Sequence, residues 1–114
     1  MSVRAYSELT YFTALSRRRL GQTARAEKLL RALRAHARRL AAEPATIDYF
    51  ATSLPAMLLF SDDLTQRQRT TALFLEAQAR LGLGQRTAAL RLLHRVLARD
   101  PAHAPAADFI TFLS

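Results

Sequence analysis

Apolar residues recur every three or four positions through most of the chain, which is the spacing of an amphipathic α-helix. The clearest case lies between residues 72 and 101, where one stripe holds Leu73, Ala77 and Leu81. A second stripe in the same segment holds Ala89, Leu93 and Leu97. The whole pattern predicts an all-α protein without β-sheet, with helices at about 5–20, 22–42, 46–53, 55–60, 64–82, 85–99 and 105–113.

Small residues and helix-ending residues join the two stripes into an antiparallel hairpin over about 64–101. Ala77 and Ala89 stand where the two helices would cross, and alanine allows the helix axes to approach closely. Gly84 can take a positive φ at no steric cost and so ends the first helix. Pro101 ends the second helix, because the residue before proline is pushed out of the α region.

A weaker copy of this hairpin is predicted upstream, over about 5–42. Its small residues Ala14, Gly21 and Ala26 align with Ala77, Gly84 and Ala89. The two copies are separated by nearly twice the usual helical repeat of about 34 residues. Arg38 stands where the closing proline of the first copy would be, so its second helix is expected to continue to about residue 42.

The segment between the copies, about 44–63, is rich in apolar and aromatic residues. We interpret it as a helical plug between the hairpins, with an exposed docking patch as the alternative. One of Ser61, Asp62 and Asp63 is predicted to cap a helix that enters at Leu64. After the second hairpin, residues 105–113 are predicted to form a capping helix, with Phe109 and Phe112 on one face.

The spacing of these small residues resembles the tetratricopeptide repeat (TPR), a helical hairpin whose framework residues hold shape and perform no chemistry. Residues 10–105 resemble more narrowly the C-terminal TPR region of large bacterial proteins. Those proteins carry an N-terminal, mutarotase-like domain of unknown function. The narrower likeness rests on IDYFATSLP, a DDL step, an LGLG turn and a closing DP. The framework residues would be Ala14, Gly21, Ala26, Ala77, Gly84, Ala89 and Pro101.

The resemblance implies one TPR-like domain over 1–114 that acts as a protein-interaction scaffold. Its partner would be a protein, a peptide or an adjacent domain of a longer polypeptide. TPR hairpins present their first helices to a concave side, so the candidate groove contacts are Tyr11, Leu15, Phe74 and Gln78. Chaperone-binding TPRs have charged side chains at such positions to grip a carboxylate. These four residues are uncharged, so that activity is not expected.

Positive charge is concentrated in the first hairpin. The chain has a formal net charge of +8, and residues 1–42 hold ten basic but only two acidic side chains. Arg31, Arg34 and Arg38 form a stripe along the second helix, which could bind a polyanion. We favour a solvated surface and expect no nucleic-acid partner, because no aromatic residues interleave with these arginines to stack on bases.

Arrangements that carry catalysis are not visible in the sequence. The chain has no cysteine, and its three histidines, His36, His94 and His103, lie far apart. We therefore predict a protein that is not an enzyme and uses no cofactor or metal.

Neither a signal peptide nor an apolar run long enough to span a bilayer is apparent, which predicts a cytoplasmic location. Leu9 and Phe12 on the opening helix have no preceding repeat to cover them, so we also expect a homodimer.

Overall fold

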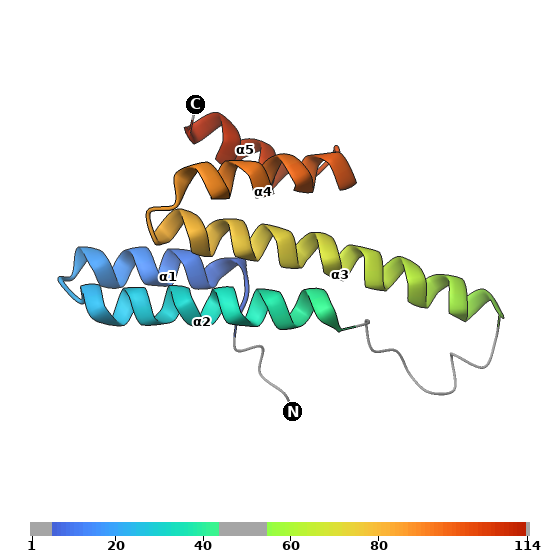
Figure 1. Ribbon diagram of the computed structural model, residues 1–114, viewed down its shortest axis with the longest axis horizontal. Coiled ribbons are helices and arrows are strands. Elements are labelled where there is room, and N and C mark those ends of the chain that lie inside the picture. The colour runs from blue at the N-terminus through green and yellow to red at the C-terminus, as the bar shows by residue number, and fades with distance from the viewer. Residues whose placement is uncertain (1–5, 44–54, 114) are drawn as a thin grey trace.

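The computed structural model describes the backbone of residues 6–43 and 55–113, and the side chains of 6–43 and 63–113. The described residues form five α-helices and no β-strand, which confirms the predicted all-α fold class (Figure 1). In chain order the helices are α1 (Glu8–Arg19), α2 (Thr23–Ala42), α3 (Pro55–Gly82), α4 (Arg86–Arg99) and α5 (Ala104–Leu113).

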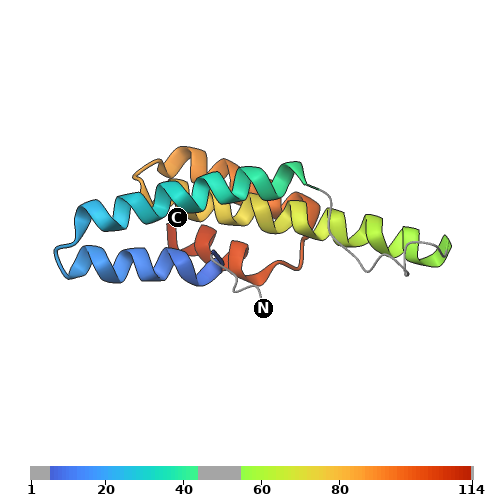
Figure 2. The same cartoon turned by 90° about the horizontal axis from the view of Figure 1, so that it is seen from below.

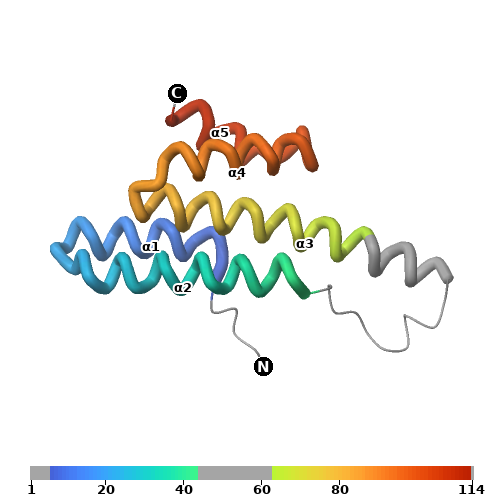
Figure 3. Tube along the Cα trace, in the orientation of Figure 1, coloured from blue at the N-terminus to red at the C-terminus, as the bar shows by residue number. Residues whose placement is uncertain are grey.

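The helices form two antiparallel hairpins and a final helix. α1 pairs with α2 and α3 pairs with α4, while α3 also packs against α2 and so joins the hairpins (Figures 1 and 3). The last helix, α5, packs on α4 and lies on the same side of the molecule as α1 (Figure 2). The result is a thin body of 52 × 33 × 19 Å in which α3 is the central helix.

The two hairpin turns depend on glycine, as the sequence predicts. Gly21 has a φ of 81° and Gly84 a φ of 84°, a region that side chains bearing a Cβ rarely adopt. At the other end of α1, the Ser7 backbone N–H donates to Thr10 Oγ1 over 2.9 Å, and the Ser7 side chain accepts from the helix backbone. This capping box fixes the start of α1.

Four alanines lie at close helix contacts. Ala14, Ala26, Ala77 and Ala89 are all buried, in agreement with their predicted positions in the two hairpins. Pro101 lies in the exposed turn that follows α4. A further close contact involves Gly82, the last residue of α3, where an added Cβ would lie 2.7 Å from both δ carbons of the buried Leu30. α2 and α3 therefore approach each other closely at this point.

The predicted boundary between the insert and the second hairpin is wrong. Residues 55–63 belong to α3, so neither Ser61, Asp62 nor Asp63 caps a new helix at Leu64. Serine and aspartate cost only a few tenths of a kcal/mol each inside a helix. Asp63 also pairs with Arg67 one turn later, over 3.1 Å, which supports the continuous helix. The helix predicted at 46–53 lies outside the described residues.

Candidate functional site

The predicted groove residues do not line an open groove. Tyr11, Phe74 and Gln78 are buried and Leu15 is half-buried, so the prediction that they contact a partner is wrong for this arrangement. The cause is α5. Its Phe109 ring lies 5.6 Å from the Tyr11 ring and 5.6 Å from the Phe74 ring, and both pairs meet edge to face. α5 therefore fills the space between α1 and α3 that would otherwise receive a ligand.

Gln78 has a structural contact in place of the predicted binding role. Its Nε2 donates a hydrogen bond of 3.2 Å to the backbone carbonyl of Glu8, which ties α3 to the first turn of α1. Its Oε1 has no hydrogen-bond partner among the described residues. Because the Nε2 end of this buried amide is hydrogen-bonded to α1, we expect Gln78 to hold α1 in position on α3.

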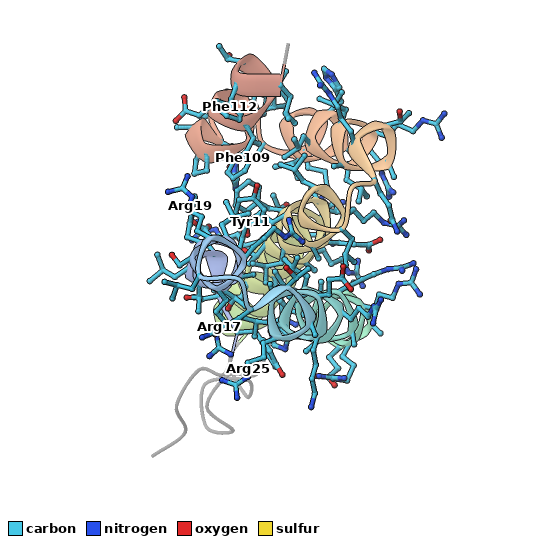
Figure 4. All side chains as sticks on the ribbon, turned by 90° about the vertical axis from the view of Figure 1, so that its left-hand side faces the viewer. Tyr11, Arg17, Arg19, Arg25, Phe109 and Phe112 are labelled. Carbon is cyan, nitrogen blue, oxygen red and sulfur yellow. The ribbon has the colours of Figure 1, made fainter. Side chains whose placement is uncertain are left out.

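A different set of apolar residues is exposed. Phe12 on α1 is 50% exposed and Phe112 on α5 is 84% exposed, and the Phe12 and Phe109 rings lie 6.3 Å apart. Leu9, 73% exposed, lies one turn before Phe12 on α1. Figure 4 shows Phe109 on the side of α5 toward Tyr11 of α1, and Phe112 farther from α1 on the same helix. We call the surface made by Leu9, Phe12, Phe109 and Phe112 the α1–α5 surface.

The exposure of Phe112 corrects the expectation that both phenylalanines of α5 cover the second hairpin. α5 buries Ala106 and Leu113 there instead, and Phe109 turns toward Tyr11 and Phe74. Residues 109 and 113 are four apart and share one helical face, whereas Phe112 lies beside that face. The aromatic side chain that the sequence places in a cap is therefore available at the surface.

Basic side chains border the α1–α5 surface. Arg17, Arg18 and Arg19 occupy the last turn of α1, where cations favour the negative end of the helix dipole. Arg19 is exposed on the side of α1 that faces α5, and Arg17 lies on the opposite side (Figure 4). Burial raises the pKa of the Tyr11 phenol, and the nearby Arg18 cation opposes that rise in pKa. Two exposed carboxylates, Glu8 and Asp108, lie at other points of the two helices.

The predicted basic stripe on α2 is only partly a solvated face. Arg31 and Arg38 are exposed, and Arg31 pairs loosely with Glu27 over 3.7 Å. Arg34 differs because it is half-buried and its Nε is buried without a hydrogen-bond partner among the described residues. Burial, together with the neighbouring Arg80 and Arg38 cations, lowers the pKa of Arg34, while Glu76 acts in the opposite direction on that pKa.

Two of the histidines have packing contacts. His103 Nδ1 accepts a hydrogen bond of 3.1 Å from the Ala106 backbone N–H and so caps α5, and its ring lies 5.0 Å from that of Phe74. The His36 ring lies 5.2 Å from the Tyr6 ring.

Within the described part of the chain, no three His, Cys, Asp or Glu side chains gather in a group that could hold a metal ion. None of the helices there combines the length and the apolar character needed to cross a membrane.

Comparison of the chain with protein-family models, with curated proteins and with solved structures found no match.

Proposed function

We propose that the chain is a non-catalytic protein-interaction module of TPR type that binds on its α1–α5 surface. The ligand we propose is a peptide segment that carries apolar side chains flanked by acidic ones. It would belong to another protein or to an adjacent domain of a longer polypeptide. The proposal rests on the hairpin architecture and on the one-sided distribution of exposed apolar residues described next.

Three of the four exposed large apolar side chains among the described residues belong to the α1–α5 surface: Leu9 and Phe12 on α1 and Phe112 on α5. The fourth, Leu20, lies at the C-cap of α1. The exposed positions of the other hairpin helices are polar residues, alanine or basic residues, the basic ones being Arg25, Lys28, Arg31, Arg38 and Arg39 on α2, Arg67 and Arg69 on α3, and Arg86, Arg91, Arg95 and Arg99 on α4. Neighbouring exposed aromatic rings of this kind mark interaction sites more often than solvated surface.

The positive charge beside the α1–α5 surface favours an acidic partner. Arg19 borders it at one end of α1, and the chain as a whole carries a formal charge of +8. An acidic flank on the partner would pair with this end, while the partner's apolar side chains would cover Phe12 and Phe112. Phenylalanine and arginine together are typical of the energetically dominant part of a protein interface.

Affinity capture with paired variants tests the proposal. A double variant, Phe12→Ser with Phe112→Ser, should remain folded, with a lower melting temperature because Phe12 is only 50% exposed and its ring packs against Tyr11 and Phe109. It should lose the partner that the unmodified chain captures from cells. The matched control is Leu20→Ser, since Leu20 is 74% exposed but lies at the hairpin tip away from α5. Equal loss with the control, or full retention with the double variant, would contradict the α1–α5 surface as the binding site.

Polyanion binding through Arg31, Arg34 and Arg38 is the second candidate function. Arg34 favours it, because an anion bound beside Arg34 would offset the repulsion from the neighbouring Arg80 and Arg38 cations. The dependence of binding on salt concentration distinguishes the two candidate functions. Affinity for a polyanion falls steeply with salt through counterion release, whereas capture that depends on Phe12 and Phe112 should persist at physiological salt.

A further inference from the structure

Three arginines from two helices line one groove beside the turn between α3 and α4. The groove has a volume of about 470 Å³ and is lined by residues from the end of α1, from positions 27–34 of α2 and from 82–85. Its charged lining consists of Arg18 from α1 and Glu27, Arg31 and Arg34 from α2. We call this the arginine groove; it is separate from the α1–α5 surface and shares none of its residues.

The positive charge in the arginine groove is only partly neutralised. Glu27 lies 3.7 Å from Arg31, and both side chains are largely exposed, so the pair is weak. The carboxylate of Glu76 on α3 pairs over 2.9 Å with Arg80, itself a neighbour of Arg34. Arg18 and Arg34 therefore have no carboxylate partner among the described residues.

Arg34 is the residue that most needs an anion. Its Nε is buried and makes no hydrogen bond to the described residues. Arg80 and Arg38 lie near enough to disfavour its charged form. A buried donor without a partner costs free energy, and natural proteins rarely leave one unless a ligand or ordered water completes it. A bound anion would offset the repulsion between Arg34 and the neighbouring arginines.

Arg18 is already held in place for such a ligand. Its Nη2 donates a hydrogen bond of 2.9 Å to the Gly82 carbonyl, at the start of the turn that Gly84 shapes with its positive φ. One nitrogen is thus fixed, and the other donors of the planar guanidinium remain to bind an oxyanion. Fixing a side chain before the ligand arrives lowers the entropy lost on binding.

We propose that the arginine groove is a binding site for a single phosphate group. Three guanidinium groups against one carboxylate suit a dianion better than the single charge of a carboxylate ligand. The groove has the size of a small-molecule site, which fits a phosphorylated metabolite or a phosphorylated side chain. The inference does not depend on the α1–α5 surface, whereas it shares Arg31 and Arg34 with the second candidate function and narrows the ligand of that function to one phosphate group.

Titration of the intact chain at constant ionic strength tests the site. The two probes are inorganic phosphate and N-acetyl-phosphoserine amide, each followed by calorimetry and by the melting temperature. We expect saturable binding of one probe per chain. Stronger binding of the phosphoserine derivative would assign a phosphorylated side chain as ligand, and stronger binding of inorganic phosphate would assign a small phosphate-bearing molecule.

Matched variants separate a built site from general attraction to a basic protein. Arg34→Gln and Arg31→Gln should each weaken binding about tenfold or more, as the loss of a charge-assisted hydrogen bond implies. Glu27→Gln should strengthen binding, because it removes the competing carboxylate. The control, Arg91→Gln, makes the same change of charge at an exposed position of α4 and should leave binding unchanged.

The following outcomes would overturn the proposed phosphate site. Binding that does not saturate, or that Arg91→Gln weakens as much as Arg31→Gln does, would show only general electrostatic attraction. If Arg34→Gln fails to fold by circular dichroism, the Arg31 and Glu27 variants decide the question, since the Arg31 side chain is 70% exposed and Glu27→Gln keeps nearly the same size and shape. Unchanged affinity in both of them would exclude the arginine groove as the site.

Discussion

At the scale of single residues, glycine has two different roles in this chain. Gly21 and Gly84 have the positive φ that a tight reversal after a helix end needs. Gly82 instead lies at a close contact between two helices. Its role depends on Leu30, more than fifty positions away, which lies against it only after α2 has packed on α3.

Gly82→Ala tests that contact. Alanine has the higher helix propensity and would by itself stabilise α3 by up to about 1 kcal/mol. The added methyl, however, would lie 2.7 Å from both δ carbons of Leu30, which is completely buried and has little room to move. Overpacking of this kind costs about 1–3 kcal/mol. We therefore expect a net loss of stability in urea unfolding.

The partner residue supplies the control for Gly82→Ala. In a Leu30→Ala background the methyl at position 82 has space, so the same change should become neutral or stabilising. The two single variants and the double variant form a cycle whose coupling free energy measures the contact directly. A coupling near zero would mean that α2 and α3 do not meet at Gly82 and Leu30.

At the scale of helices, the sequence predicted which segments are helical better than it predicted how they pack. Six of the seven predicted segments coincide with the five observed helices, two of them within α3, because amphipathic spacing is a property of each helix alone. The break at residues 61–63 was wrong because side chains that can cap a helix are also tolerated inside one. The prediction of a groove lined by Tyr11, Phe74 and Gln78 was wrong because α5 covers these residues. No periodicity in the sequence shows where a terminal helix will pack.

α5 carries two phenylalanines with opposite roles, and they form a matched pair. Phe109 contacts the rings of Tyr11, Phe12 and Phe74, whereas Phe112 is 84% exposed. Phe109→Ala should therefore destabilise the fold by about 2–3 kcal/mol, less than a fully buried phenylalanine because Phe109 remains half-buried. Phe112→Ala should change stability by less than about 0.5 kcal/mol. Thermal unfolding of both variants measures the difference.

The pair also separates packing from binding on the same helix. If Phe109→Ala leaves the melting temperature unchanged, α5 is not held between α1 and α3 and the predicted groove would be open after all. If Phe112→Ala destabilises the chain as much as Phe109→Ala does, the α1–α5 surface is part of the core and cannot be the docking face we propose.

At the scale of the whole molecule, the chain has a thin shape. Its Cα radius of gyration is 15.7 Å, against about 13 Å for a compact domain of this length. A stack of helical hairpins has this property because each hairpin packs only against its neighbours. Its end helices therefore expose a face that a further repeat would otherwise cover, and in this chain α1 and α5 expose Phe12 and Phe112.

A second copy of the chain could cover those faces, and we expect a homodimer at micromolar concentration when no other partner is present. The contact would be isologous, with the α1–α5 surface of one copy on that of the other. Each copy carries a formal charge of +8, so the two copies repel each other while their apolar surfaces attract. Salt screens the repulsion without weakening apolar contact, and the dimer should therefore become tighter as salt is raised.

Sedimentation equilibrium at low and high salt distinguishes this dimer from the binding of an acidic partner, which salt should weaken. The variant with Phe12→Ser and Phe112→Ser should sediment as a monomer at both salt concentrations, and Leu20→Ser should dimerise like the unmodified chain. A monomer of 12.8 kDa at every salt concentration would contradict self-association. In that case the attraction between two small apolar patches does not exceed the repulsion between two strongly basic chains. The exposed phenylalanines would then need an acidic partner rather than a second copy.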